Sequence, residues 1–132
     1  MKSTVLVFAC ACTAVPAYAQ QSPPPQSSQV LKQIAPPSPT GEKLEARVVS
    51  ITFPLGYVGG WHSHPTPPII YVMEGTFTVE VRDKDPIETK AGQAVLEPIN
   101  TVIRATNKGT TPTRIVIFQM SPPDLPDARP AQ

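Results

Sequence analysis

The chain has 132 residues and a formal net charge of +1, from 11 lysines and arginines against 10 aspartates and glutamates. This length suits one domain, and neither sign of charge is clustered along the chain. A nucleic acid or an anionic membrane surface would need a stripe of basic residues as its partner, so neither is expected to bind.

The first 19 residues have the order of a secretory signal peptide. Lys2 gives a short positive start, and residues 4–15 are largely apolar and contain no charge. Ala17 and Ala19 then supply the small residues that precede a cleavage site, here before Gln20. We therefore expect residues 1–19 to be a signal peptide and the protein to be exported, either periplasmic or secreted.

Two alternatives remain for this segment. An uncleaved anchor helix would need a longer apolar run to span a bilayer. A lipoprotein signal would use Cys10 or Cys12, but the bulky Phe8 fits a lipidation site poorly. Both cysteines precede the expected cut, so the mature chain would have no disulfide, no thiol nucleophile and no cysteine-bound metal. We expect no stable membrane insertion after removal of the signal.

The next segment, residues 20–42, has the composition of a linker and N-terminal extension. Residues 20–29 contain only Gln, Ser and Pro, which cannot bury apolar surface, so we expect them to be disordered. Residues 30–35 include a few apolar side chains and suit either a short strand or one helical turn. The prolines at 36, 37 and 39 stop any regular element.

From residue 43 the chain has the pattern of β-strands. Residues 44–53 are rich in β-branched side chains, which favours a strand. Residues 69–73 form a short apolar run that ends before a turn at Gly75. Over residues 77–82 apolar and polar side chains alternate, and this period of two marks a strand with one buried face.

Short strands and turns continue to the end of this region. Residues 94–96, 102–105 and 115–120 are predicted strands, and residues 107–109 are expected to join the last two as a hairpin. No long segment has a helical period, so we expect one all-β domain, a sandwich or barrel, over residues 43–120. The tail, residues 121–132, contains four prolines and should be irregular or frayed.

The two histidines of the chain, His62 and His64, are two residues apart. On a strand, residues i and i+2 point to the same side, so both imidazoles can face one point inside a barrel. A divalent metal could use them as neighbouring ligands, and imidazole suits iron, manganese, copper, nickel and zinc alike. Alternatively, the pair hydrogen-bonds water or an organic ligand, or packs as ordinary surface histidines.

The spacing around the histidines resembles the two motifs of the cupin superfamily. The first motif reads G-x5-H-x-H-x3-E-x6-G, and the residues in register with it are Gly56, His62, His64 and Gly75. The second reads G-x5-P-x-G-x2-H-x3-N, and the residues in register with it are Gly92, Pro98 and Asn107. The resemblance covers residues 43–120 and implies a small, single-domain, type 2 cupin, a jelly-roll β-barrel with the histidine pair at its mouth.

The same resemblance shows which ligands this chain lacks. Cupin metal sites use both histidines of the first motif, its Glu, and the His of the second motif. Here the Glu position holds Pro68, the second His position holds Ile103, and the inner glycine of the second motif is Asn100. The resemblance therefore implies a metal-binding ancestor and half of its ligand set. Glu97, near the strand of the second motif, is our candidate for a third ligand.

Strand parity predicts which neighbouring side chains point inward. If Ile103 faces the interior, as the family's His does, Ala105 shares that face and Arg104 points out. On the strand after Pro68, Ile70 lies on the inner face and Tyr71 on the outer one. The interior would then be mainly apolar, and it would suit a small apolar or aromatic molecule that one polar contact orients.

The candidate ligand-binding residues are His62, His64, Trp61 and Asn107. Trp61 is first of all expected to be a packing residue at the barrel rim, with stacking on a ligand as the alternative. Burial of the histidines would lower the pKa of their imidazoles, because desolvation disfavours the charged form.

Three functions are compatible with these features. The first is an exported protein that binds a small molecule, a divalent metal or both through His62 and His64, without robust catalysis. The second is a metal-dependent oxygenase or isomerase with an unconventional third ligand. The third is a non-catalytic structural or regulatory module in which the barrels pair as a homodimer through edge strands. The sequence does not decide whether the protein is an enzyme.

Overall fold

The computed structural model describes residues 22–35 and 41–131. The expected signal peptide, residues 1–19, lies outside the described residues. Within the described residues every regular element is a strand, and none is a helix long and apolar enough to cross a membrane. The prediction of an all-β domain is therefore confirmed.

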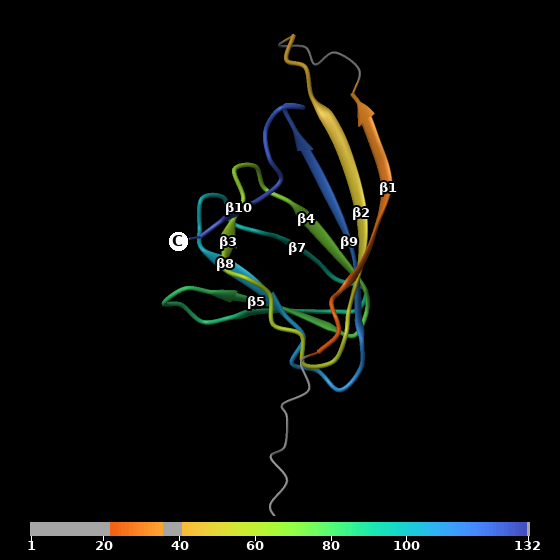
Figure 1. Ribbon diagram of the computed structural model, residues 1–132, viewed down its shortest axis with the longest axis vertical. Coiled ribbons are helices and arrows are strands. Elements are labelled where there is room, and N and C mark those ends of the chain that lie inside the picture. Colours follow the sequence, from red (N-terminus) through yellow and green to blue (C-terminus); the bar gives the residue numbers. More distant parts are fainter. Residues whose placement is uncertain (1–21, 36–40, 132) are drawn as a thin grey trace, which may run out of the picture.

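Two five-stranded antiparallel sheets face each other across the core (Figure 1). The first sheet has the order β1-β2-β9-β4-β7. Its strands are β1 (Gln26–Ile34), β2 (Glu45–Phe53), β9 (Thr113–Ser121), β4 (Ile69–Glu74) and β7 (Ala94–Leu96). The second sheet has the order β10-β3-β8-β5-β6. Its strands are β10 (Arg129–Pro130), β3 (His62–Ser63), β8 (Ile103–Thr106), β5 (Thr76–Val81) and β6 (Ile87–Lys90).

The core lies between the two sheets and follows the period-two pattern of the strands. On β4, Ile70 and Val72 are buried while Tyr71 is exposed, as parity predicted. On β8, Ile103 is fully buried, and it faces the interior as the corresponding family residue would. The buried apolar side chains are Phe53, Ile70, Val72, Phe77, Val79, Val81, Ile103 and Ile115.

The N-terminal extension corrects the expectation of a disordered linker. Residues 26–29 belong to β1, which pairs with β2 from Gln26↔Thr52 to Ile34↔Glu45. The strand forms although its side chains are all exposed, because its backbone groups complete the ladder along the edge of β2. Between the two possibilities for residues 30–35, the structure therefore selects a strand.

The expected hairpin over residues 107–109 is also wrong. β8 pairs with β5 and β3, whereas β9 pairs with β2 and β4 in the other sheet. The turn thus carries the chain from one sheet to the other. Turn residues predict that the chain changes direction, but they do not predict which strands pair. The same residue types occur in hairpins and in connections between two sheets.

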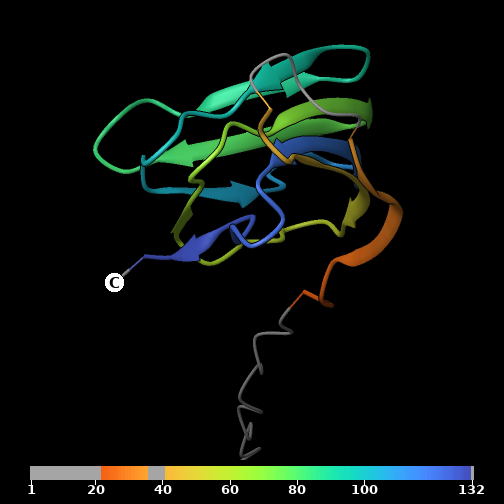
Figure 2. The same ribbon diagram turned by 90° about the horizontal axis from the view of Figure 1, so that it is seen from above.

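The C-terminal tail is more ordered than its prolines suggest. β10 pairs with β3 through Arg129↔Ser63 and Pro130↔His62, and the Ala131 N–H donates to the Trp61 carbonyl at 2.9 Å. Proline is tolerated here because β10 is an edge strand, where an N–H is not required on the outer side. The tail is therefore fixed beside β3, the strand that begins with His62. The view from above in Figure 2 shows this end of the chain running along the edge of the barrel.

Gly75 explains why the first motif ends in glycine. Its φ is +76°, in the left-handed region, and a Cβ atom there would lie 2.7 Å from the Pro112 carbonyl oxygen. The inner glycine position of the second motif, Asn100, has a φ of +51°, a conformation that asparagine adopts more readily than other non-glycine residues.

Candidate ligand site

Short strand β3 brings the two histidines to one side of the barrel wall. His62 pairs with Ile103 on β8, and the His64 carbonyl accepts a hydrogen bond from the Asn100 N–H at 2.9 Å. The two rings meet edge to face with centroids 4.9 Å apart, and their Nε2 atoms are 3.1 Å from each other. The prediction from i, i+2 spacing, that both imidazoles face one point, matches this arrangement.

Glu97 joins the pair from the opposite sheet. It follows β7, and its backbone N–H donates to the Pro68 carbonyl at 3.1 Å, which fixes its position. Its side chain is buried, and its Oε2 lies 3.1 Å from His64 Nε2. The structure thus brings together His62, His64 and Glu97, the three residues that sequence reasoning proposed as metal ligands. We call these three side chains the polar cluster.

The C-terminal tail holds the far side of the His64 ring. His64 Nδ1 donates to the Asp127 carbonyl at 2.7 Å, and Gln119 Nε2 donates to the same oxygen at 3.3 Å. Arg47 keeps this tail in place, because its guanidinium donates to the Asp127 carboxylate and to the Pro123 carbonyl at 3.1 Å. Sequence reasoning missed this support, since nothing in a proline-rich tail signals a contact to a histidine 63 residues earlier.

The hydrogen bonds made by the two Nδ1 atoms determine which groups face one another inside the polar cluster. His62 Nδ1 donates to the Gly60 carbonyl at 2.9 Å, just as His64 Nδ1 donates to Asp127. In a neutral imidazole the other nitrogen is then an acceptor. Both Nε2 atoms and the Glu97 carboxylate would therefore meet as three acceptors, unless a proton or another cation lies among them.

The pKa of His64 is consistent with a proton in this position. Burial of the ring lowers the pKa, but hydrogen bonds from the ring to the Glu97 carboxylate and to the Asp127 carbonyl outweigh burial. The pKa of His64 is raised above its usual 6.5 as a result. Burial acts in the expected direction, but the expected net decrease of the His64 pKa is wrong, because that expectation did not include the hydrogen bonds to Glu97 and Asp127.

A cavity of about 260 Å³ opens next to the polar cluster, and all three cluster residues line it. The rest of its wall is mainly apolar and comes from both sheets, including Ile51, Phe53, Tyr57, Ile70, Phe77 and Ile115. Pro25 and Ser27 of the N-terminal extension complete the wall. The cavity therefore has one polar end and an apolar body, the usual composition of a small-molecule site.

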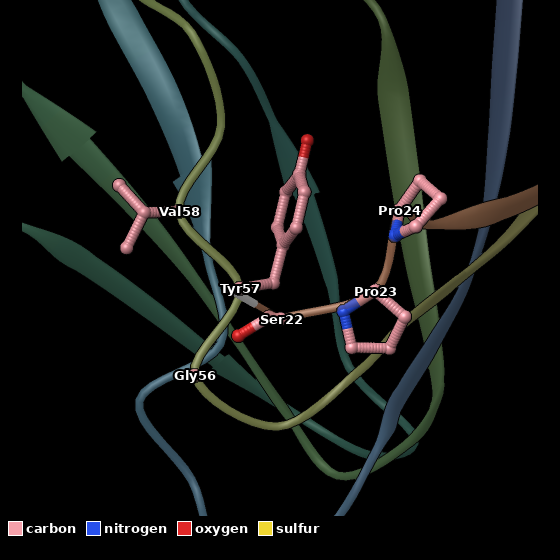
Figure 3. Close-up of a pocket in the computed structure, with 6 residues that line it drawn as sticks. All are labelled: Ser22, Pro23, Pro24, Gly56, Tyr57 and Val58. Atoms are coloured by element: carbon pink, nitrogen blue, oxygen red, sulfur yellow. The ribbon is translucent and has the colours of Figure 1, made fainter. Parts of the chain in front are cut away.

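A second hollow of about 330 Å³ lies beside this cavity, where the N-terminal extension meets the loop after β2 (Figure 3). Ser22, Pro23 and Pro24 form one side of it, and Ser22 Oγ donates to the Leu55 carbonyl at 3.1 Å. Figure 3 shows the Tyr57 ring standing between Val58 and the two prolines. Tyr57 lines both the hollow and the cavity.

The other two candidate ligand-binding residues lie outside the cavity. Trp61 has two guanidinium groups against its ring, that of Arg104 at 4.5 Å and that of Arg82 at 5.5 Å from its centroid, which gives it a packing role at the rim. Asn107 is buried, and its Nδ2 donates to the carbonyls of Phe53, Pro54 and Thr111. The structure thus uses Asn107 to hold loops together.

The polar cluster matches a metal site in its donor types but not in its arrangement. Two imidazoles and one carboxylate suit a divalent transition metal, and both Nδ1 atoms are anchored to carbonyls as in metal-ligating histidines. However, the contacts run in a chain from His62 through His64 to Glu97. In the part of the chain that the structure describes, no group of three or more His, Cys, Asp and Glu side chains is placed to hold a metal ion.

The two facing antiparallel sheets and the histidine pair at one end define the double-stranded β-helix class. Residues 49–118 match the family model of the cupin domain. The chain belongs to the cupin family and is a small type 2 cupin, as its two motifs predicted. Pro68 and Ile103 stand, both buried, at the positions of the two missing family ligands.

Solved structures of the same fold lie at low sequence identity. A conserved protein with a double-stranded β-helix domain from Klebsiella pneumoniae is 20% identical, covers 89% of this chain and 91% of its own, and has a TM-score of 0.62. An RmlC-like cupin from Methanocaldococcus jannaschii is 14% identical, with coverage of 86% and 94% and a TM-score of 0.61. The polyketide cyclase RemF from Streptomyces resistomycificus is 18% identical, with coverage of 66% and 61% and a TM-score of 0.55. No curated protein matches the chain.

Proposed function

We propose that this protein binds a small, mainly apolar molecule in the barrel cavity, with one oxygen-bearing group of that molecule at the polar cluster. The observation that carries the proposal is the cavity itself, whose apolar walls end at His62, His64 and Glu97. Its volume of about 260 Å³ suits a molecule of one substituted ring or a short branched chain.

The polar cluster gives the molecule its orientation. His64 Nδ1 is committed to the Asp127 carbonyl, so only Nε2 faces the cavity side, and the same holds for His62 with the Gly60 carbonyl. A hydroxyl or an acidic oxygen placed there could exchange a proton with the cluster. A hydrogen bond to a charged group of this kind contributes about 1.5–3 kcal/mol to binding.

Phenol and toluene are suitable probes, because they share one shape and differ in the hydroxyl. The experiment is a titration of the chain with each probe, followed by NMR of isotope-labelled isoleucine methyl groups. The methyl signals of Ile51, Ile70 and Ile115, which line the cavity, should shift. Ile34 and Ile69, which are exposed and outside the cavity, are the controls. Shifts that are equal at all five isoleucines, or absent, would count against the proposed site.

A divalent metal is the second candidate ligand, and the anchoring of both Nδ1 atoms favours it. The contacts of the cluster would have to rearrange from a chain into a common centre. Metal analysis after supply of iron, manganese, copper, nickel and zinc distinguishes the two candidates. One equivalent that disappears in the His62→Ala/His64→Ala variant supports a metal, and no bound metal in either protein eliminates it.

We also propose that the protein is exported and works in the periplasm or outside the cell. The proposal rests on the sequence of residues 1–19 alone, with its charged start, apolar run and small residues before Gln20. Mass spectrometry of the N-terminus of the protein recovered from its native cells tests it. A mature chain that starts at Gln20 supports export, and an intact Met1 in the cytoplasm contradicts it.

A further inference from the structure

The N-terminal extension forms the outermost part of the wall of the ligand cavity. Pro25 and Ser27 line the cavity, and Ser27 pairs with Ile51, another cavity residue, on the inner face of the first sheet. Of the described residues that line the cavity, Ser27 is the only exposed one. Pro25 is half-buried, and all residues of β1 are exposed. The extension therefore separates the cavity from solvent while it buries little of its own surface.

A bulge divides β1 into two runs of paired residues. The register with β2 shifts across Val30, which is 63% exposed. A bulge leaves its extra residue unpaired and interrupts the ladder locally. Residues 26–29 and residues 31–34 are therefore two separate runs, and one of them can open while the other stays paired. We call residues 22–29, which contain the first run and the residues before it, the strap.

The ladder to β2 and an exposed side-chain hydrogen bond, from Ser22 Oγ to the Leu55 carbonyl at 3.1 Å, hold the strap. The three prolines at 23–25 have no N–H to donate to a ladder. The first two form one side of the hollow of about 330 Å³ in Figure 3, so the strap is not packed tightly against the barrel there. Opening of the strap breaks few contacts, which is typical of segments that unfold locally.

The second run of β1 has further anchors. Lys32 Nζ lies 3.8 Å from Glu45 Oε1, and the Ala35 N–H donates to the Leu44 carbonyl at 2.8 Å. These contacts lie at the end of β1 that is away from the cavity. They keep the second run on β2 when the strap opens, so the bulge between the runs can act as a hinge.

We propose that the strap is the gate of the ligand cavity: it opens at Val30 to admit the ligand and then closes with Pro25 and Ser27 against the bound molecule. This inference rests on the proposed ligand site. β1 is the edge strand of its sheet, so the strap separates from one neighbour only (Figure 1). The ring of each proline fixes φ, so the run at 23–25 is stiff and moves as one piece.

A gate of this kind affects the rates of binding more than the affinity. The strap must open for entry of the ligand and again for its release, so a strap that is held closed lowers both rate constants. Their ratio, the dissociation constant, changes little, because the closed state is the one that holds the ligand in either case. Damage to the cavity itself would instead weaken the affinity.

A disulfide on the outer face of the first sheet can hold the strap closed without entering the cavity. Ser28 pairs with Ser50, and parity places this pair on the face opposite Ser27. The test chain is therefore Ser28→Cys/Ser50→Cys. The matched control is Gln33→Cys/Ala46→Cys, a pair of the second run, beyond the bulge and on the same outer face. In both chains the native cysteines are replaced by serine.

The rate constants for phenol are measured by NMR line-shape analysis of the methyl signals of Ile51, Ile70 and Ile115. We expect oxidation of Ser28→Cys/Ser50→Cys to lower the association and dissociation rate constants by about tenfold or more, with a change in affinity below about twofold. Reduction with dithiothreitol should restore both rates. Oxidation of the control chain should leave them unchanged.

Amide hydrogen exchange tests the opening of the strap without any ligand, and it also decides the case if the disulfide does not form. The amides that residues 26–29 donate to β2 should exchange together and about tenfold or more faster than those of residues 31–34. Ser22→Ala removes the bond to the Leu55 carbonyl and should speed the exchange of the first run further. Ser28→Ala, at an exposed position outside the cavity, is the control and should not.

Two results would overturn the gate. One is a pair of phenol rate constants that oxidation of Ser28→Cys/Ser50→Cys leaves unchanged, and the other is equal exchange in the two runs of β1. Phenol that binds to none of these chains would contradict the proposed ligand site instead. The difference in exchange between the two runs then still decides whether the strap opens at the bulge.

Discussion

His64 Nδ1 lies 2.7 Å from the carbonyl oxygen of Asp127, a residue 63 positions later in the chain. This single contact links the C-terminal tail to the candidate ligand site. It fixes the proton of the ring on Nδ1 and directs Nε2 toward His62 and Glu97. The tail is thus part of the site, although it contributes no side chain to the cavity.

Replacement of Arg47 should release the tail and destabilise the protein. The Arg47 guanidinium bonds to the Asp127 carboxylate and to the carbonyls of Pro123 and Leu125. We expect Arg47→Gln to lower the free energy of unfolding in urea by about 1–3 kcal/mol. Arg114→Gln is the control, because its pair with Glu74 is largely exposed and should contribute at most about 0.5 kcal/mol. Equal losses in both variants would contradict a special role for the Arg47 contacts.

The pKa of His64 should fall when the charge of Glu97 is removed. Desolvation already lowers this pKa, and the hydrogen bond to Glu97 is the largest contribution that raises it. We therefore expect Glu97→Gln to lower the pKa of His64 in an NMR titration of the ring protons. Glu80→Gln is the control, since Glu80 pairs with Arg104 and Lys108. An unchanged pKa in Glu97→Gln would show that the carboxylate does not act on the ring.

The raised pKa of His64 also predicts how the stability of the protein depends on pH. A group whose pKa is raised on folding contributes stability that is complete below the pKa of the unfolded chain, here about 6.5, and is lost as the pH rises through the folded pKa. The free energy of unfolding should therefore decline above pH 6.5, and Glu97→Gln should flatten the decline.

The contribution of Glu80 to stability changes in a different pH range from that of His64. Lys108 first, and then Arg104, lower the pKa of Glu80 below its usual 4.5, so its contribution is lost only as the pH falls through that lower value. Urea unfolding at several pH values between 5 and 9 therefore tests the contribution of His64 without that of Glu80. Stability that rises over this range would contradict the assignment.

Asn107 should matter for stability and not for ligand binding. Its side chain is buried, donates to three backbone carbonyls and accepts the Gly109 N–H at 3.0 Å. We expect Asn107→Ala to reduce the free energy of unfolding by about 2–4 kcal/mol, because several buried groups lose their partner. The affinity of the folded variant for phenol should equal that of the wild type. A folded Asn107→Ala variant with a lower affinity for phenol would show that Asn107 takes part in ligand binding.

Two motif glycines allow steric contact to be separated from backbone strain. Both Gly75 and Gly92 have positive φ, but only at Gly75 would a Cβ meet neighbouring atoms, 2.7 Å from the Pro112 carbonyl oxygen. Gly92→Ala should cost about 1–2 kcal/mol from the left-handed conformation alone. Gly75→Ala should cost clearly more in the same urea experiment. Equal costs would mean that the turn at Gly75 moves freely to accept the methyl group.

The sequence predicts local features of this fold well. The strands over residues 44–53 and 77–82 follow from β-branched composition and alternation, which are properties of neighbouring residues. The two motifs in register predicted the cupin fold, and the i, i+2 spacing predicted that His62 and His64 converge. Glu97 was named as a candidate because of its place beside the second motif, and it lies next to His64.

Contacts between distant segments could not be predicted in the same way. β1 forms because an edge of β2 is open to its backbone, not because its Gln and Ser side chains favour a strand. Asp127 contacts both His64 and Arg47, and no local pattern connects these three residues. The direction of the His64 pKa shift was predicted wrongly because the prediction considered burial alone, whereas hydrogen bonds to Glu97 and to the Asp127 carbonyl raise this pKa.

The central claim is that the polar cluster recognises an oxygen-bearing group at the end of an apolar cavity. The most direct test is the ratio of the affinities for phenol and toluene, measured in the wild-type chain and in the His62→Ala/His64→Ala variant. We predict a ratio of at least ten in the wild type, which corresponds to about 1.4 kcal/mol, and a ratio near one in the variant. Retained toluene binding shows that the variant is folded. An unchanged ratio in the two proteins would contradict the claim.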